Sequence, residues 1–305
     1  MLQQRMDMGE PLGRASFLKT HNSYNSRAYA NLGSYHDPNH TLSLVTQLDM
    51  GIRALELDVH NYNNNLLLCH GQDNHLGCSV FDRKFEDGIK EVATWLTRSG
   101  NRDQMVILYL EDHVDGRYDD VMAIMNQHMG SLIYKPGSCQ SLPNSLSKAD
   151  VINSGKQVVV IGGNCGTAAW GQFAYQGTYP TDNGNFYPWP DCRTDNWSSS
   201  YIQNHLVRMF EDSTILSSLF GDPPPAITPQ RMRDAMDCGF GVVGLDQLDY
   251  FDSRLRAAIW SWGEGEPNNA NNDEDCAAQR GDGRFNDLSC SAVRPFACYN
   301  PSQDS

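Results

Sequence analysis

The chain has 305 residues, enough for one large catalytic domain, and its charge is strongly acidic. Its 23 Lys and Arg residues against 37 Asp and Glu residues give a formal net charge of −14. This balance argues against a nucleic-acid partner and against nonspecific adhesion to anionic membranes, because both require a basic surface. The longest apolar stretches, such as 158–161, have only the length of a strand, so we expect no transmembrane helix.

The cysteine content indicates an oxidising compartment, because nine cysteines are many for a cytosolic enzyme. The spacings from Cys69 to Cys78 and from Cys276 to Cys290 suit bridged loops better than zinc knuckles. We expect Cys69 to form a disulfide with Cys78 across a small loop. Residues 1–5 lack the basic-then-apolar layout of a signal peptide. We therefore expect a secreted protein whose leader is missing from this sequence.

Short apolar runs alternate with amphipathic segments, which predicts an α/β fold. Strands are expected over 17–20, 52–58, 66–70, 105–111, 132–134, 157–161 and 241–245. Helices are expected over 40–50, 82–98, 118–128, 146–152 and 201–220. The segment 162–200 is rich in Gly, Asn, Pro and aromatic residues, and we expect an extended loop there.

Four of the predicted strands end in ionisable or metal-binding side chains. The first is followed by His21-Asn22-Ser23-Tyr24, the second ends in Glu56-Leu57-Asp58, the third in His70, and the fourth in Glu111-Asp112-His113. Strands that all deliver polar groups at their carboxyl ends indicate a (β/α) barrel of the TIM type, with the chemistry at one mouth.

The polar groups at these strand ends suit a calcium ion. Asn22, Glu56, Asp58 and Glu111 offer hard oxygen ligands, which Ca²⁺ prefers. Glu56 and Asp58 point to the same face of their strand, because side chains alternate with a period of two. Along that strand no basic residue alternates with them except Arg53, at its other end.

Two histidines complete the expected chemistry. His21 and His70 follow the first and third predicted strands, so they are expected to face each other across the mouth. A base, an acid and a cation are the components that phosphodiester cleavage requires. His60, His75 and His113 lie nearby, and we interpret them as structural or supporting residues.

The four strings, in this order and at this spacing, resemble the X region of phosphoinositide-specific phospholipases C over roughly residues 14–250. The resemblance implies a catalytic domain over 1–255 that cleaves phosphatidylinositol at a membrane surface. It implies that His21 contacts the phosphate and that His70 protonates the leaving group. It leaves open whether His21 or a calcium-ligating carboxylate such as Glu56 is the general base.

The same resemblance implies that Ca²⁺ is the cofactor. In this family Asn22, Glu56, Asp58 and Glu111 match the calcium ligands. Small calcium-independent bacterial members carry Asp after the first His and Arg in place of the second-strand Asp. Asn22 and Asp58 in this chain therefore indicate the calcium-dependent kind.

The expected substrate is unphosphorylated phosphatidylinositol, because the strand ending at Ile161 is not followed by the lysines that bind extra phosphates. Asp246 is a weak candidate for orienting His21 or contacting inositol hydroxyls. Two other interpretations remain open. One is another barrel phosphodiesterase, of the sphingomyelinase-D or glycerophosphodiesterase type. The other is a carbohydrate-binding protein with a degenerate barrel.

Residues 256–305 form a separate segment that resembles the second half of a C-type lectin domain. The resemblance rests on Glu266-Pro267-Asn268, on Glu274 ahead of Cys276, and on Asn286-Asp287. It implies a second calcium site that binds glycans through Glu266, Asn268, Glu274, Asn286 and Asp287, and a disulfide between Cys276 and Cys290. A disulfide-stapled appendage that binds no ligand is the alternative.

Overall fold

The computed structural model describes most of residues 8–162, without 14, 16, 36–37, 137–142 and 144. Beyond these it describes 181–182, 186–188, 190–204, 208–209, 238, 242–245, 268, 270–274, 276–279, 285–289 and 291–292. The chain divides into two compact units, Met1–Ala258 and Ile259–Ser305. No helix in the described part is long and apolar enough to cross a membrane.

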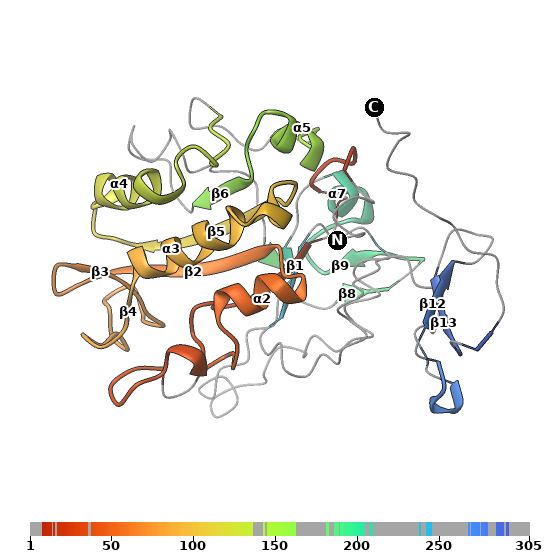
Figure 1. Cartoon of the computed structure of the whole chain (residues 1–305), viewed down its shortest axis with the longest axis horizontal. Coiled ribbons are helices and arrows are strands. Elements are labelled where there is room, and N and C mark those ends of the chain that lie inside the picture. The colour runs from red at the N-terminus through yellow and green to blue at the C-terminus, as the bar shows by residue number, and fades with distance from the viewer. Residues whose placement is uncertain are drawn as a thin grey trace. The chain divides into compact units, whose positions relative to one another are not determined.

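The first unit is built on a nine-stranded sheet (Figure 1). Its parallel strands lie in the order β6 (Val158–Gly162), β5 (Val106–His113), β2 (Ala54–Tyr62), β1 (Phe17–Thr20), β11 (Val242–Leu245), β10 (Arg208–Met209) and β7 (Thr181–Asp182). Because these strands run in one direction, their carboxyl ends meet at the same edge of the sheet. The predicted α/β class and the parallel sheet are therefore present.

The third predicted strand has a different direction from the one expected. Strand β3 (Asn65–Leu68) runs antiparallel to the end of β2, and β4 (Arg83–Lys84) runs antiparallel to β3. The turn between β2 and β3 consists of Asn63 and Asn64, with φ values of 47° and 60°. Two successive left-handed residues make the tight hairpin turn that asparagine tolerates. His70 therefore follows a hairpin strand rather than a strand of the parallel set.

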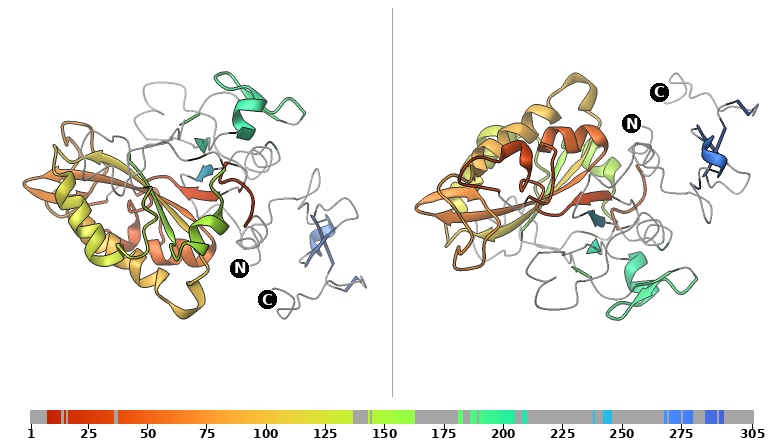
Figure 2. Two further views of the ribbon diagram at one scale, coloured as in Figure 1. Left: turned by 90° about the horizontal axis from the view of Figure 1, so that it is seen from above. Right: turned by 90° about the horizontal axis from the view of Figure 1, so that it is seen from below.

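Helices α2 (Leu44–Met50), α3 (Phe85–Leu96) and α4 (Tyr118–Met129) pack side by side along the sheet, with α3 between the other two (Figures 1 and 2). Helix α2 begins after Ser43, whose hydroxyl accepts from the Thr46 amide at 3.2 Å, and ends at Gly51 in the left-handed region. Helix α3 starts later than predicted because 83–84 form β4. Helix α5 (Lys148–Asn153) precedes β6 and carries a capping box.

Apolar side chains cover one face of the sheet near the amino ends of its parallel strands. Strand residues Phe17, Ala54, Ile107, Val159 and Ile161 form a buried cluster with Leu12, Ala15, Met105, Leu146 and Val151. The strand members share one face, because Ala54 is the register partner of Ile107, and Ile107 that of Val159. Further along β2 the same face carries Glu56 and Asp58. The core thus changes from apolar to charged toward the carboxyl ends of the strands.

The later part of the unit contains short elements where a loop was predicted. Strands β8 (Phe186–Tyr187) and β9 (Arg193–Thr194) form an antiparallel pair, and α7 (Ser199–Asn204) follows. A disulfide joins Cys192 to Cys238, and a second joins Cys69 to Cys78 as predicted. In the second unit, β12 (Cys276–Gln279) and β13 (Phe285–Leu288) form an antiparallel pair.

Candidate functional site

Three carboxylates gather at the carboxyl ends of β2 and β5. One oxygen each from Glu56, Asp58 and Glu111 lies within 4.8 Å of the others. Sheet register explains the grouping, because Asp58 is the partner of Glu111 and Glu56 precedes Asp58 by one full period of β2. Glu56 and Asp58 are buried, whereas Glu111 is partly exposed. The structure thus brings together three of the four side chains predicted to bind calcium.

Asp58 is held in an environment that disfavours its charge. Its side chain is 4% exposed, and Tyr24 donates a hydrogen bond to Oδ2 at 2.7 Å. Oδ1 is buried and has no hydrogen-bond partner among the described residues. Burial, followed by the nearby charges of Glu111 and Glu56, raises the pKa of the Asp58 carboxyl well above its usual range. A buried acceptor beside two like charges is a site where a cation relieves both costs.

The sequence interpretation missed a buried lysine from the neighbouring strand. Lys19 is 0% exposed and forms an ion pair with Glu56, which is 1% exposed. Its ammonium also lies 5.6 Å from the centre of the Tyr109 ring. The expectation about basic residues concerned β2 alone, and Lys19 comes from the adjacent strand β1. A lysine inside the apolar run 17–20, two residues before His21, was the available signal.

The loop after β1 is fixed to β2 by hydrogen bonds. The Ser23 amide donates to the Glu56 carbonyl at 3.0 Å, and the Ser23 hydroxyl accepts from the Glu56 amide at 2.8 Å. Gln47 of α2 donates to the Ser23 carbonyl at 2.8 Å. A ring nitrogen of His40 lies 2.6 Å from the His21 carbonyl oxygen. The backbone of His21, a residue that is 8% exposed, is therefore held in a loop that is fixed to β2.

Asn22 lies in the same fixed loop with a left-handed backbone, at φ 47°. It is 2% exposed, and its neighbour Ser23 contacts the Glu56 backbone as described above. Asparagine is one of the few residues that adopt this conformation readily. The strand-to-loop turn thus accounts for asparagine at this position. Asn22 directly precedes Ser23, the residue that contacts the backbone of Glu56.

His70 lies on an exposed loop that begins at the end of β3. The Cys69–Cys78 disulfide closes this loop, and Cys69 directly precedes His70. Gly71, the residue after His70, lies against the His60 ring, because a Cβ at that position would be 3.3 Å from His60 Cε1. His60 is on β2, two residues beyond Asp58, on the same face. The Cys69 amide donates to the Asp58 carbonyl at 3.3 Å, so His70 lies near the end of β2, on a hairpin rather than at the end of a parallel strand.

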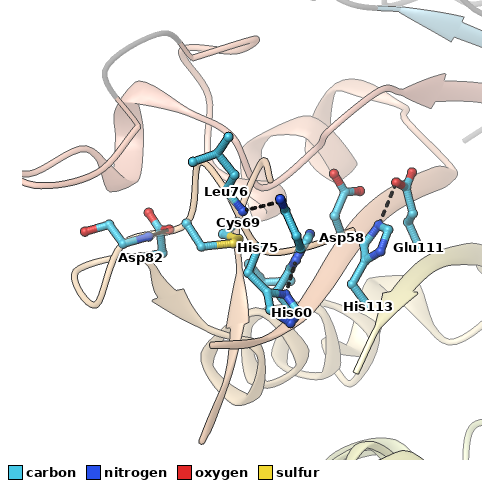
Figure 3. The surroundings of a disulfide bond; sticks show 12 residues. Asp58, His60, Cys69, His75, Leu76, Asp82, Glu111 and His113 are labelled. Atoms are coloured by element: carbon cyan, nitrogen blue, oxygen red, sulfur yellow. Dashed lines mark hydrogen bonds and ion pairs between the residues drawn. A yellow bond between two sulfur atoms is a disulfide. The ribbon is translucent and has the colours of Figure 1, made fainter. Parts of the chain in front are cut away.

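Figure 3 shows His60 next to both His75 and His113. The His60 ring stacks on that of His113 at 4.3 Å, and its Nδ1 lies 3.0 Å from Nδ1 of His75. Burial is the main cause that lowers the pKa of His60 to about 4. His113 lies 2.9 Å from Glu111 through Nε2, and this contact raises the pKa of His113. Among these histidines, His113 contacts a carboxylate of the cluster, and His60 contacts the other two rings.

The donor set fits a hard divalent cation. Three carboxylates within 4.8 Å supply the oxygen ligands that Ca²⁺ takes, and the buried Oδ1 of Asp58 lacks a partner among the described residues. Lys19 offsets the negative charge of Glu56, and the charges of Asp58 and Glu111 remain when both are ionised. Glu56, Asp58 and Glu111, with Asn22 beside them, are the residues that can hold the ion.

The remaining predicted site residues fall elsewhere. Asp246, Glu266 and Cys290 lie outside the described residues. In the second unit the Asn268 amide donates to Oδ1 of Asp287 at 2.9 Å. Glu274 accepts from the Ala270 amide at 2.8 Å, and Asn286 lies on β13 opposite Ala278. The structure thus brings Asn268 to Asp287.

The fold is similar to that of two solved bacterial enzymes. The phosphatidylinositol-specific phospholipase C of Listeria monocytogenes matches with a TM-score of 0.51 at 14% identity, covering 84% of this chain and 95% of that one. The Staphylococcus aureus phosphatidylinositol-specific phospholipase C matches with a TM-score of 0.54 at 11% identity, covering 82% and 91%. At these identities the similarity concerns the fold, and it confirms the predicted TIM-barrel-like architecture.

Sequence comparison identifies a relative and a family. A Mycobacterium tuberculosis H37Rv protein, named Uncharacterized protein Rv2075c, is 32% identical over 319 residues. The alignment covers 94% of this chain and 65% of that protein, so the chain spans about two thirds of its relative's length. Residues 1–252 match the family described as the Rv2075c PI-PLC-like domain. Because this match spans 252 of the 305 residues, the chain belongs to the Rv2075c PI-PLC-like domain family.

Proposed function

We propose that the first unit is a calcium-assisted phospholipase C that cleaves phosphatidylinositol into diacylglycerol and a cyclic inositol phosphate. The observation that carries this proposal is the cluster of Glu56, Asp58 and Glu111 beside the fixed His21 loop. Cleavage by a neighbouring hydroxyl requires a base, an acid and positive charge at the phosphate. Ca²⁺ held by this cluster and Asn22 would supply that positive charge when bound.

The chain's own residues supply the proton transfers. His21, or Glu56 as the alternative, takes the proton of the inositol 2-hydroxyl, whose oxygen then bonds to phosphorus. The bond from phosphorus to the diacylglycerol oxygen breaks, and His70 protonates that oxygen. The positions support these roles, because His21 is held by its backbone against β2 and His70 is exposed on its loop. Fixed positions lower the entropic cost of reaching the transition state.

The proposed substrate is phosphatidylinositol without extra phosphates. Strand β6 ends at Gly162, and the next residues in the sequence are Gly163 and Asn164, which offer no positive charge to a second phosphate. The proposed contact between Asp246 and the inositol ring is a further part of this substrate model. Asp246 directly follows β11, the strand that pairs with β1, which carries the His21 loop at its end.

The proposed partner is a phospholipid surface, contacted through apolar side chains. The exposed large hydrophobic residues of the described part are Leu32, Leu76, Val80 and Phe81, at 103%, 66%, 58% and 62% exposure. They lie on the two loops that follow β1 and β3, the loops that carry His21 and His70. Asn31 joins these loops by donating to the Phe81 carbonyl at 3.0 Å. Exposed apolar side chains beside a candidate site support contact of this surface with a membrane.

The proposed location is outside the cytosol. The disulfides Cys69–Cys78 and Cys192–Cys238 support it, because such bonds persist in oxidising compartments. This part of the proposal is independent of the catalytic mechanism.

A lipid panel tests the proposed activity. Vesicles of phosphatidylcholine are doped with phosphatidylinositol, its bisphosphate, sphingomyelin or lysophosphatidylcholine, and products are identified by mass spectrometry. We expect diacylglycerol from phosphatidylinositol in calcium and none in excess chelator. Ceramide phosphate or a lysophosphatidic acid as the main product would instead support the sphingomyelinase-D-like alternative.

A further inference from the structure

We propose that Lys19 is a built-in counter-charge that sets the calcium affinity of the carboxylate cluster through Glu56. This inference rests on the proposed calcium site and deepens it, by naming the residue that tunes that site. Lys19 is a positioning residue here, because it acts on the ion through Glu56 and not by direct contact.

The position of Lys19 is unusual for a lysine. Its side chain is 0% exposed, and lysine is almost never fully buried unless it is paired. Lys19 is the register partner of Ala54, so its ammonium extends about one period of β2 toward the mouth to reach Glu56. The Tyr109 ring, whose residue is the register partner of Glu56, lies 5.6 Å from the ammonium. The lysine side chain therefore extends toward the cluster from the amino-terminal side of β2.

Lys19 offsets one negative charge of the cluster through its ion pair with Glu56. Glu56, Asp58 and Glu111 carry three negative charges when ionised, and Lys19 removes one of them. The two that remain are neutralised by one divalent cation. Without the lysine, the buried carboxylates of Glu56 and Asp58 and the partly exposed Glu111 would together keep one more negative charge, with or without Ca²⁺.

The ion pair also constrains how Glu56 can bind an ion. Lys19 contacts Oε2, so this oxygen is shared with the ammonium. An ion in the cluster therefore shares or competes for Oε2 with the ammonium. Lys19 lowers the calcium affinity by its charge and fixes the direction from which Glu56 approaches.

Calcium titration of four chains tests the inference. They are the reference chain, Lys19→Met, Glu56→Gln and the double variant Lys19→Met/Glu56→Gln. Methionine keeps most of the lysine volume, and glutamine keeps an oxygen ligand. All four carry Glu274→Ala and Asn286→Ala, so that the lectin-like unit does not contribute calcium binding. Affinity is measured by calorimetry at pH 8, where free carboxylic acids are ionised.

The expected order follows from the charge of the cluster. Lys19→Met should bind Ca²⁺ at least tenfold more tightly than the reference, and Glu56→Gln at least tenfold more weakly. The double variant keeps the reference charge, so its affinity should fall close to the reference. A lysine with a purely structural role predicts the opposite for Lys19→Met, because loss of a packed ion pair would loosen the site and weaken binding.

A second comparison keeps the inference testable if Lys19→Met does not fold. The double variant and Glu56→Gln differ only in Lys19, and neither leaves an unpaired glutamate. The double variant should bind Ca²⁺ more tightly. Equal affinities in this pair, or no calcium binding by the reference chain, would overturn the inference. Calcium binding in the expected order without lipid cleavage would refute the proposed activity and leave the role of Lys19 intact.

Discussion

The phenol oxygen of Tyr24 lies 2.7 Å from Oδ2 of Asp58, and both side chains are buried. Burial and the Asp58 charge raise the pKa of the Tyr24 phenol well above its usual range, so Tyr24 remains a donor at any physiological pH. The hydrogen bond orients Asp58, whose other oxygen has no partner among the described residues. Tyr24, on the loop after β1, thus fixes the orientation of Asp58 on β2, one of the residues proposed to hold the cation.

Asp58→Asn should stabilise the calcium-free protein at neutral pH. The pKa of Asp58 is raised in the folded state, so its contribution to stability is present below the unfolded pKa and is lost as pH rises through the folded pKa. Asparagine removes this loss and can still accept from Tyr24. In chelator we expect a higher Tm than wild type at pH 7, and a difference that shrinks in acid. A lower Tm of the variant at pH 7 would contradict the described environment of Asp58.

The two candidate histidines should fail in different ways. His21→Ala and His70→Ala should each lower kcat by about 10²–10⁴-fold, the usual cost of losing a general acid or base. His70→Ala should recover on a substrate with an acidic leaving group, because that group needs no proton. His128→Ala, whose ring contacts Glu86 away from the site, is the matched control. Equal losses of His70→Ala on both substrates would reject His70 as the acid.

The β2–β3 hairpin shows what the sequence could and could not predict about the fold. Apolar periodicity located β1, β2, β3, β5 and β6 within a few residues. It does not distinguish parallel from antiparallel strands, because side chains alternate in the same way in both. The direction of β3 was nevertheless encoded in Asn63-Asn64, a two-residue turn that requires positive φ at both positions. The turn residues, not the strand residues, carried that information.

The site shows a similar division. Glu56, Asp58 and Glu111 were predicted together, because strand alternation and strand ends place them on one face. Lys19 was missed because its partner is on the adjacent strand, 37 residues away in the sequence. Register between β1 and β2 determines that pairing, and register is not readable from either strand alone. The disulfide between Cys192 and Cys238 was missed because cysteine positions in the sequence do not determine which cysteines pair across 46 residues.

The apolar patch should matter only when the lipid is in a membrane. Leu76→Ser and Phe81→Ser together should reduce binding to phosphatidylinositol vesicles and hydrolysis of them by at least tenfold. Cleavage of a short-chain, monomeric substrate should be unchanged, because the catalytic residues are untouched. Gln72→Ser, an exposed change in the same loop, is the matched control. Equal loss on monomeric and vesicular substrate would place these side chains in catalysis or folding.

The second unit should not bind mannose-type glycans in calcium. Asp287 and Glu274 accept backbone hydrogen bonds within the unit, so these carboxylates have internal roles. We expect no calcium-dependent retention of the full chain on immobilised mannose. Retention that disappears in Asn286→Ala would contradict this and establish the sugar site. In either case Asn286→Ala should leave lipid cleavage unchanged.

The most direct test of the central claim is ³¹P NMR of the water-soluble product formed from phosphatidylinositol, with calcium and with excess chelator. The account predicts cyclic inositol phosphate in calcium, no product in chelator, full recovery when calcium is restored, and no product from folded Asp58→Ala. Full turnover in chelator would contradict the role of the Glu56, Asp58 and Glu111 cluster as a calcium site. A product other than an inositol phosphate would contradict the proposed reaction.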